Sequence, residues 1–126
     1  MRITLTAKGE YNKVEKWLNR LLNKEYLNIL DKYGRRGVDA LSSATPIDTG
    51  NTAASWGYEI HHDSGSTIIN WTNSNINKGV SIAILLQYGH GTGTGGYVRG
   101  RDYINPALRP IFDSMADELW KEVSRL

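Results

Sequence analysis

The tripeptide Asp48-Thr49-Gly50 is the first group of residues in this sequence whose types and spacing could do chemistry. In aspartic proteases two such aspartates share one proton at a dimer axis, and a chain of 126 residues is long enough to supply one half. However, Thr45-Pro46 stands where those proteases have an apolar strand. A connecting turn, with Asp48 as its cap and a positive φ at Gly50, is therefore the favoured interpretation, and the protease is a minor alternative.

A glycine pattern supplies the second candidate. Gly91, Gly93 and Gly96 satisfy G-x-G-x-x-G, the spacing of a dinucleotide-binding turn, provided that residues 80–88 form the preceding strand. No helix pattern opens directly after the glycines, no acidic residue follows at the required distance, and the Lys-Ser/Thr of a P-loop is missing. A glycine-rich loop without a cofactor is the favoured interpretation.

Histidine and cysteine offer little for a metal or a nucleophile. The histidines are His61, His62 and His90, and neighbours on a strand point to opposite faces, so His61 and His62 cannot readily chelate one ion. The chain has no cysteine, which excludes a Cys-ligated zinc, a Cys nucleophile and a disulfide framework. We therefore expect no metal, no cofactor and no catalytic centre.

A nucleic-acid surface is the remaining chemistry that the residue types suggest. Cationic and aromatic residues alternate ahead of the last segment: Tyr97, Arg99, Arg101, Tyr103 and Arg109. They could contact phosphates and stack on bases, but Asp102 dilutes the charge and the net charge of the chain is only +2. Since Arg and Tyr are also enriched at protein interfaces, a protein surface is the favoured partner.

Hydrophobic periodicity predicts the elements that must position these residues. The patterns indicate a strand over 3–7, helices over 10–22 and 26–41, a β-hairpin over 55–61 and 67–72, a helix within 80–88 and a last helix from Asn105-Pro106 to the end. The second helix must end before Pro46, and Pro110 implies either a later start or an irregular first turn for the last helix. Gly34 and Gly37 could let another backbone approach the second helix, with Arg35 and Arg36 facing solvent.

Two segments are predicted to lie outside these elements. Residues 73–79 read as a polar loop, and residues 89–96 are so rich in glycine that we expect them to be ordered only by a partner.

Composition and element order together predict one α+β domain over residues 1–126, with long N-terminal helices and a C-terminal helix packed on a small antiparallel β-sheet. Hydrophobic residues make up 40% and charged residues 22%, which is typical of a globular chain. Residues 1–45 carry nine Lys/Arg against five Asp/Glu, whereas residues 46–126 carry six against eight, so the halves differ in sign. No run of about 18 apolar residues and no signal peptide is found, so the cytoplasm is the expected location.

Three stretches follow one another in a recognisable order: Ala44-Thr45-Pro46-Ile47-Asp48-Thr49-Gly50, Leu86-Gln87-Tyr88-Gly89-His90-Gly91-Thr92 and Asp102-Tyr103-Ile104-Asn105-Pro106-Ala107-Leu108. Together they resemble the tail-completion or head-tail joining (neck) protein family of long-tailed phages and prophages. That family shows a helix, Pro-x-Asp-Thr-Gly, a β-hairpin, an aromatic-Gly turn, and an aromatic-aliphatic-x-Pro-Ala motif that opens the last helix. The chain departs from the pattern at Thr52, where Leu is common, at Gln87, where Glu is frequent, and in a longer glycine run.

The resemblance implies a virion structural protein, a tail component that forms a homo-oligomeric ring, sixfold in symmetry, between the portal or adaptor of the capsid and the tail tube or tail terminator. It would be present in the host cytoplasm during assembly and then in the virion, with no membrane and no specific nucleic acid as partner. The positions expected to carry the motifs or the assembly interface are Pro46, Asp48, Thr49, Gly50, Tyr88, Gly89, Gly91, Arg99, Arg101, Tyr103 and Pro106. We further expect residues 89–104 to become ordered on contact with a neighbouring subunit, and the basic N-terminal half to face an acidic surface.

Overall fold

The structure is a computed structural model that describes residues 2–8, 24–46, 50–63 and 66–124. In chain order its elements are β1 (Arg2–Lys8), α2 (Lys24–Ala44), the 3-10 turn η1 (Ala53–Ser55), β2 (Trp56–Asp63), β3 (Ser66–Asn73), β4 (Ile76–Asn77), β5 (Val80–Ser81), α3 (Ile82–Tyr88), β6 (Gly89–Gly91), β7 (Tyr97–Arg99) and α4 (Ile104–Ser124). The helix expected over 10–22 lies outside the described residues. The other predicted elements are present, and the α+β class is confirmed.

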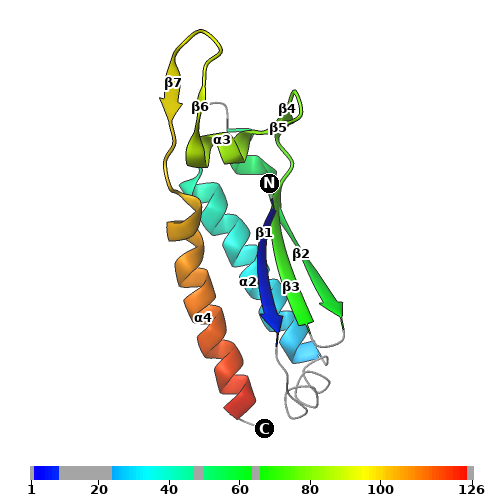
Figure 1. Cartoon of the computed structure of the whole chain (residues 1–126). Coiled ribbons are helices and arrows are strands. Elements are labelled where there is room, and N and C mark those ends of the chain that lie inside the picture. Colours follow the sequence, from blue (N-terminus) through cyan, green and yellow to red (C-terminus); the bar gives the residue numbers. More distant parts are fainter. Residues whose placement is uncertain (1, 9–23, 47–49, 64–65, 125–126) are drawn as a thin grey trace.

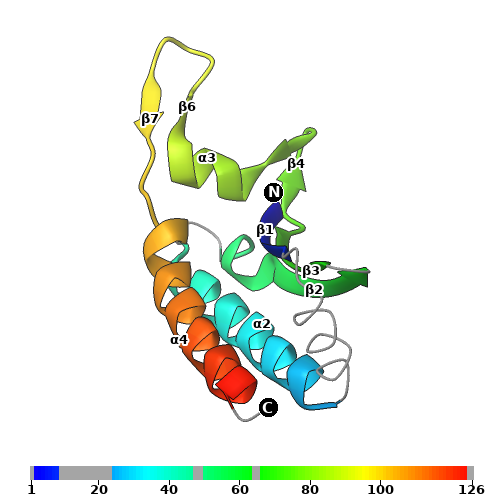
Figure 2. The ribbon, with the colours of Figure 1, turned by 60° about the horizontal axis from the view of Figure 1, so that its bottom comes forward.

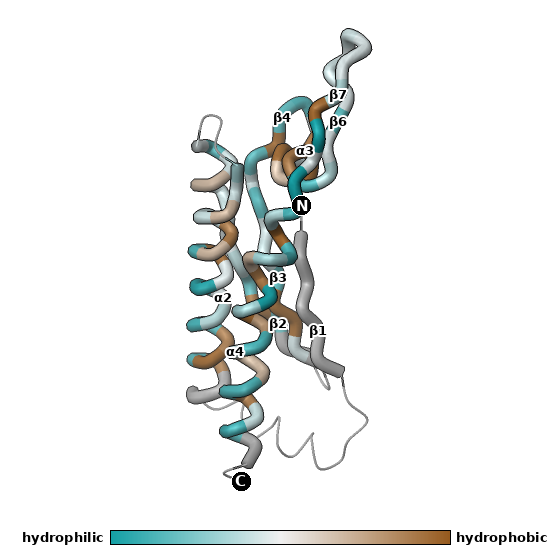
Figure 3. Tube along the Cα trace, turned by 90° about the vertical axis from the view of Figure 1, so that its left-hand side faces the viewer, coloured by the Kyte–Doolittle hydropathy of each residue, from teal (hydrophilic) through white to brown (hydrophobic). Residues whose placement is uncertain are grey.

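The body of the molecule has two layers. Helices α2 and α4 run antiparallel and side by side over one face of an antiparallel sheet with the strand order β1-β3-β2 (Figures 1 and 2). Figure 3 shows the helix layer and the sheet layer edge-on, with α3 and the short strands stacked at one end. Among the described residues, no helix is long and apolar enough to cross a membrane.

The core forms where the inward face of the sheet meets the two helices. Strands β2 and β3 pair so that Tyr58 lies opposite Trp71 and Ile60 lies opposite Ile69, which places the aromatic face predicted from the sequence against the helices. Trp71 is completely buried, and its ring lies 5.8 Å from that of Phe112 on α4. Tilted aromatic pairs at this separation add to the free energy gained from burying their area.

The glycines of α2 accommodate aromatic rings, which corrects the expectation that another backbone approaches there. A Cβ on Gly37 would lie 2.6 Å from Cε2 of Trp71, and one on Gly34 would lie 2.5 Å from Cε2 of Tyr58. The indole Nε1 of Trp71 also donates a hydrogen bond to the carbonyl of Gly34 over 3.0 Å. Glycine at these two positions lowers the helix propensity of α2, but the aromatic rings of the sheet occupy the space that a Cβ would fill. Arg35 and Arg36 face solvent, as predicted.

Helix α4 begins earlier than the sequence indicated. Its first residue is Ile104, so Asn105-Pro106 lies inside the first turn and does not open the helix. Pro110 is also inside the helix, which continues through it without a later start. Both prolines are exposed, so the carbonyl of Pro106, which loses its amide partner at Pro110, lies on the solvent side of the helix.

Beyond the body, one end of the molecule carries α3 and two short hairpins. We call residues 89–99, which comprise β6, the tip and β7, the arm, and the end that bears it the arm end; Figure 1 shows the arm projecting from α3 away from the body. The glycine-rich stretch was expected to lack order without a partner, but it forms this hairpin because Gly89–Gly91 pairs with Tyr97–Arg99. The expected loop over 73–79 likewise contains β4, which pairs with β5.

Candidate functional site

The three segments that carry the family resemblance converge at the base of the arm. An open hollow of about 600 Å³ is bordered by Thr45 and Pro46 from the first segment and by Tyr103 and Pro106 from the third. A second hollow, of about 590 Å³, is bordered by residues of the first and second segments, among them Pro46, Gly50, Leu86 and His90. Segments that lie far apart in sequence thus build one joint between α2, α3 and α4. We call it the arm joint.

Gln87 links α3 to the start of α4. Its side-chain oxygen accepts hydrogen bonds from the backbone N–H of Tyr103, at 3.0 Å, and of Ile104, at 3.1 Å. Its amide nitrogen donates to Oδ1 of Asp102 over 2.7 Å. The first N–H groups of a helix have no partner within the helix, so the buried amide of Gln87 satisfies donors that would otherwise be orphaned.

Tyr103 locks the same joint from the other side. It is only 3% exposed, and its hydroxyl donates to the carbonyl of Ala83 on α3 over 2.8 Å. Burial raises the pKa of this phenol to about 12, so it stays a protonated donor under ordinary conditions. Tyr103 was predicted to belong to an assembly interface, but its side chain is buried and connects α3 to the start of α4 within the molecule.

Thr45 closes the C-terminal end of α2. Its hydroxyl donates to the carbonyl of Leu41 over 2.5 Å and accepts a hydrogen bond from Nε1 of Trp56 over 2.8 Å. Helix α2 ends at Ala44, before Pro46, as predicted. Gly50 has a φ of +83°, which confirms the predicted positive φ. Asp48 and Thr49 lie outside the described residues.

Glycines also define the base of the arm. Gly89 has a φ of +84°, and a Cβ on it would lie 2.7 Å from the backbone N of Gly100. A Cβ on Gly100 would lie 2.6 Å from the carbonyl oxygen of Gln87. The two sides of the arm therefore leave the joint so close together that only glycine fits at positions 89 and 100.

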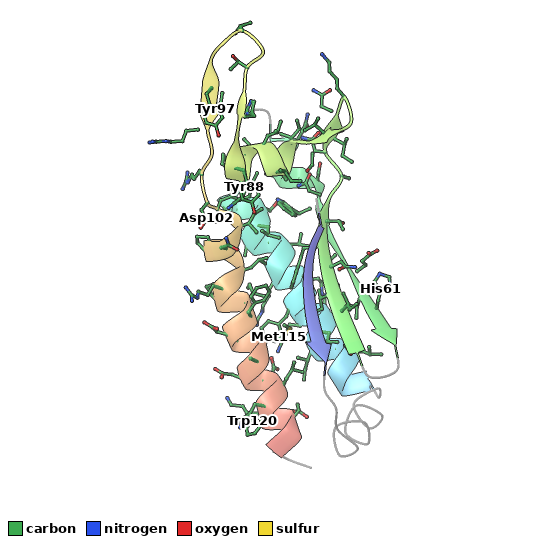
Figure 4. The ribbon with its side chains drawn as sticks, in the orientation of Figure 1. His61, Tyr88, Tyr97, Asp102, Met115 and Trp120 are labelled. Carbon is green, nitrogen blue, oxygen red and sulfur yellow. The ribbon has the colours of Figure 1, made fainter. Side chains whose placement is uncertain are left out.

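The arm itself is open to solvent. Every residue from Gly91 to Arg99 is exposed, and the phenol of Tyr97 donates to the carbonyl of Tyr88 over 3.2 Å. Figure 4 shows Tyr88 and Tyr97 at this end of the molecule. At the tip, the N–H of Thr92 donates to the carbonyl of Gly96, and the N–H of Gly96 donates to Oγ1 of Thr92. The hydrogen bonds of the tip are thus made within the tip.

The structure separates some residues that the sequence grouped together. Arg99 in the arm and Arg101 just beyond it are exposed, whereas Arg109 lies on the outer face of α4 and Tyr103 is buried. A continuous strip of alternating Arg and Tyr therefore does not form. Pro106, also predicted at an interface, is exposed in the first turn of α4.

Known proteins give no guide to the site. In comparisons with protein-family models, with curated proteins and with solved structures, nothing matches this chain.

The described residues that were considered for catalysis or cofactor binding do not have the structural surroundings that those roles require. The G-x-G-x-x-G glycines follow helix α3 and lie in a hairpin, so the strand and helix of a dinucleotide-binding unit do not flank them. Nε2 of His61 lies 3.1 Å from Oε1 of Glu59. Within the described part of the chain, no three His, Cys, Asp or Glu residues lie close enough to hold a metal ion.

Two features of this end were missed by the sequence interpretation. Gln87 was noted only as a departure from the family pattern, because a side chain that caps a helix from a distant segment leaves no periodic signal. The second feature is a group of exposed apolar side chains on β4, β5, α3 and the arm: Ile76, Val80, Ile84, Tyr88, Tyr97 and Val98. The signal available in the sequence was the presence of apolar residues within or beside polar and glycine-rich loops, where exposure is expected.

Proposed function

We propose that this chain is a structural protein of the phage neck that joins the capsid connector to the tail as a subunit of a ring. The observation that most supports the proposal is the convergence of the three family-like segments in the arm joint. Gln87, Tyr103 and Gly89 each hold backbone in place there, which suits motifs whose role in the family is structural. The proposal gives the chain no catalytic step.

The arm fits the same role. An assembly subunit needs surface that is stable alone yet free to meet a neighbour, and the exposed arm is anchored at its base by the glycine pair and by the hydrogen bond from Tyr97 to Tyr88. Exposed apolar side chains gathered in one region are typical of protein interaction sites. The expected partners are other copies of the chain, a portal or adaptor protein, and the tail tube or terminator.

Deletion of the gene from its phage or prophage tests the proposal. After induction, negative-stain microscopy of the lysate should show filled heads beside free, unjoined tails, and supplying the protein in trans should restore joined particles. Supplying an Asp39→Lys variant, which changes an exposed residue on the outer surface of α2, should restore them equally well. Normal tailed particles from the deletion would contradict the proposal.

A nucleic-acid-associated module is the second candidate, favoured by the exposure of Tyr97, Arg99 and Arg101 on and beside the arm. Binding that depends on phosphate contacts weakens steeply as salt concentration rises. Titration of a single-stranded oligonucleotide at several salt concentrations therefore separates this candidate from a protein-joining role, which does not require such binding.

A further inference from the structure

The arm end carries positive charge that has no ion-pair partner among the described residues. No acidic residue occurs between Asp63 and Asp102, whereas Lys78, Arg99 and Arg101 fall within that stretch. The side chains of all three cations are exposed, and none takes part in an ion pair among the described residues. The arm end is therefore cationic as well as apolar.

Helix α4 carries the matching negative charge on its outer face. Asp113 and Asp117 are exposed, stand one turn apart and make no ion pair with the rest of the described chain. Ala116 lies between them, and Trp120, which is 70% exposed, follows on the same face. This acidic stripe of α4 thus offers two carboxylates and apolar surface together.

A single copy of the chain cannot bring these two surfaces into contact. Asp113 and Asp117 lie about 14 and 20 Å along the axis of α4 from its first residue, at 1.5 Å per residue. The arm projects from the other end of the joint, away from α4 (Figure 1), and Trp120 lies at the opposite end of the molecule from Tyr97 (Figure 4). Contact between the surfaces requires a second molecule.

We propose that the arm end of one copy docks on the acidic stripe of α4 of the next copy, with Arg99 and Arg101 facing Asp113 and Asp117. Since the two surfaces differ, the contact is head-to-tail, and repeating it closes a ring or extends a filament. The apolar side chains of the arm, Tyr97 and Val98, pack beside Ala116 and Trp120. This inference rests on the proposed function, because it names the surfaces by which the subunits of the ring meet.

Two cations of α4 that flank the acidic stripe set the register of the contact. Arg109 stands one turn before Asp113, and Lys121 stands one turn after Asp117. A shift of the arm by one turn in either direction would place its arginines beside one of these cations. Like charges brought together in this way disfavour the wrong alignment, which makes the central carboxylates the preferred position.

Charge reversal on each side tests the inference. The arm variant combines Arg99→Glu with Arg101→Glu, and the stripe variant combines Asp113→Lys with Asp117→Lys. Each variant alone should associate at least about 100-fold more weakly than the unmodified chain in analytical ultracentrifugation, because like charges then face one another. An equimolar mixture should associate again, since the acidic arm meets the basic stripe and the basic arm meets the acidic stripe.

The controls separate this result from misfolding. Asp39→Lys reverses an exposed carboxylate on α2 and should leave association unchanged, and circular dichroism should show the same helix content in every variant. A chain that stays monomeric up to about 1 mM overturns the inference. So do variants that assemble as well as the unmodified chain, or a mixture that does not recover while the unmodified chain assembles.

Three further outcomes are distinguishable. If the arm variant keeps the assembly of the unmodified chain but loses binding to a single-stranded oligonucleotide, the arm is a nucleic-acid surface and the inference is wrong. If the mixed variants behave as expected but deletion of the gene leaves normal particles, the head-to-tail contact stands and the neck function fails. If deletion abolishes joining while charge reversal has no effect on association, only the inference fails.

Discussion

At the scale of single residues, the arm joint depends on the amide of Gln87. Replacement by methionine keeps the length of the side chain but removes the acceptor for the N–H groups of Tyr103 and Ile104. Each buried donor left without a partner costs about 1 to 3 kcal/mol, so we expect Gln87→Met to lower the free energy of unfolding by about 2 to 4 kcal/mol in urea titration.

Asn105→Ala is the matched control for Gln87→Met. Asn105 was predicted to open α4, but it is exposed in the first turn, and within the described part of the chain its amide donates to Oδ1 of Asp102 alone, over 3.2 Å. Its removal should change the free energy of unfolding by no more than about 0.5 kcal/mol. An equal loss in both variants would contradict the role assigned to Gln87.

Gly37 provides a second prediction at this scale, and its sign is opposite to that of helix propensity. Gly to Ala in an exposed helix normally stabilises by about 1 kcal/mol. At Gly37 the new methyl group would overlap the indole of Trp71, whose Cζ2 lies 2.8 Å from the Cβ position. We expect Gly37→Ala to destabilise the fold by about 1 to 3 kcal/mol through overpacking, as measured by thermal or urea unfolding.

Ser43→Ala tests the same helix without the overlap. Ser43 is exposed on α2, so the substitution should stabilise slightly or have no effect. If Gly37→Ala stabilises the protein as Ser43→Ala does, the packing of Trp71 against α2 is not as described.

At the scale of elements, the pairing of α2 with α4 includes a charge contact that responds to pH. Nζ of Lys32 lies 2.5 Å from Oε1 of Glu118, and this hydrogen bond is the main reason that the pKa of Glu118 is lowered below its ordinary value. A carboxyl whose pKa is lower in the folded state contributes stability above its unfolded pKa and loses it as the pH falls through the folded pKa. The contact therefore contributes at neutral pH and is lost in acid.

Glu118→Gln tests this linkage. At pH 7 the variant should be less stable than the unmodified chain by about 0.5 to 1 kcal/mol, a modest value because both side chains are partly exposed and screened by solvent. The difference should shrink toward zero as the pH falls well below 4.5. Urea titrations at several pH values measure it, and a difference that does not vary with pH would show that the charge contact contributes nothing.

The same contact bears on the unequal charge of the two halves of the chain. Lys32 belongs to the basic half and Glu118 to the acidic half, yet they meet inside one molecule. Among the described residues, the asymmetry therefore does not place α2 and α4 on opposite faces, because the two helices lie side by side (Figure 2).

At the scale of the whole molecule, the arm and the two-layer body should be separable. The hydrogen bonds of the tip are made within the tip, so deletion of Thr92 to Gly95 should change the free energy of unfolding of the body by no more than about 0.5 kcal/mol. The same deletion should block the assembly of joined particles in a complementation assay, because only Gly96 would then join Gly91 to Tyr97. One residue is too short a turn for the β6–β7 pairing that presents Tyr97 and Val98 to a neighbour.

Thr94→Ala keeps the length of the arm and serves as the control for that deletion. It should support normal particle formation, since the hydroxyl of Thr94 contacts that of Thr92 at the exposed tip. Joined particles from the deletion variant would show that the arm tip is not needed for assembly.

Periodicity alone determined the α+β class and most of the elements. The alternation of Trp56, Tyr58 and Ile60 and the helical stripe of α2 each report burial on one side of an element, and burial of that kind leaves a repeat in the sequence itself. Proline placed the end of α2 correctly, because its effect on the preceding residue is local.

Only the tertiary structure shows the contacts between residues that lie far apart in sequence. Gly34 and Gly37 face Tyr58 and Trp71 from a distant strand, and Gln87 caps a helix that starts 17 residues later. Each of these contacts depends on where two separately formed elements meet. The sequence pattern around one residue therefore does not indicate its partner. The same holds for the hairpin form of the glycine-rich arm. Gly89 and Gly100 are needed at its base only because the two sides of the hairpin approach each other closely there.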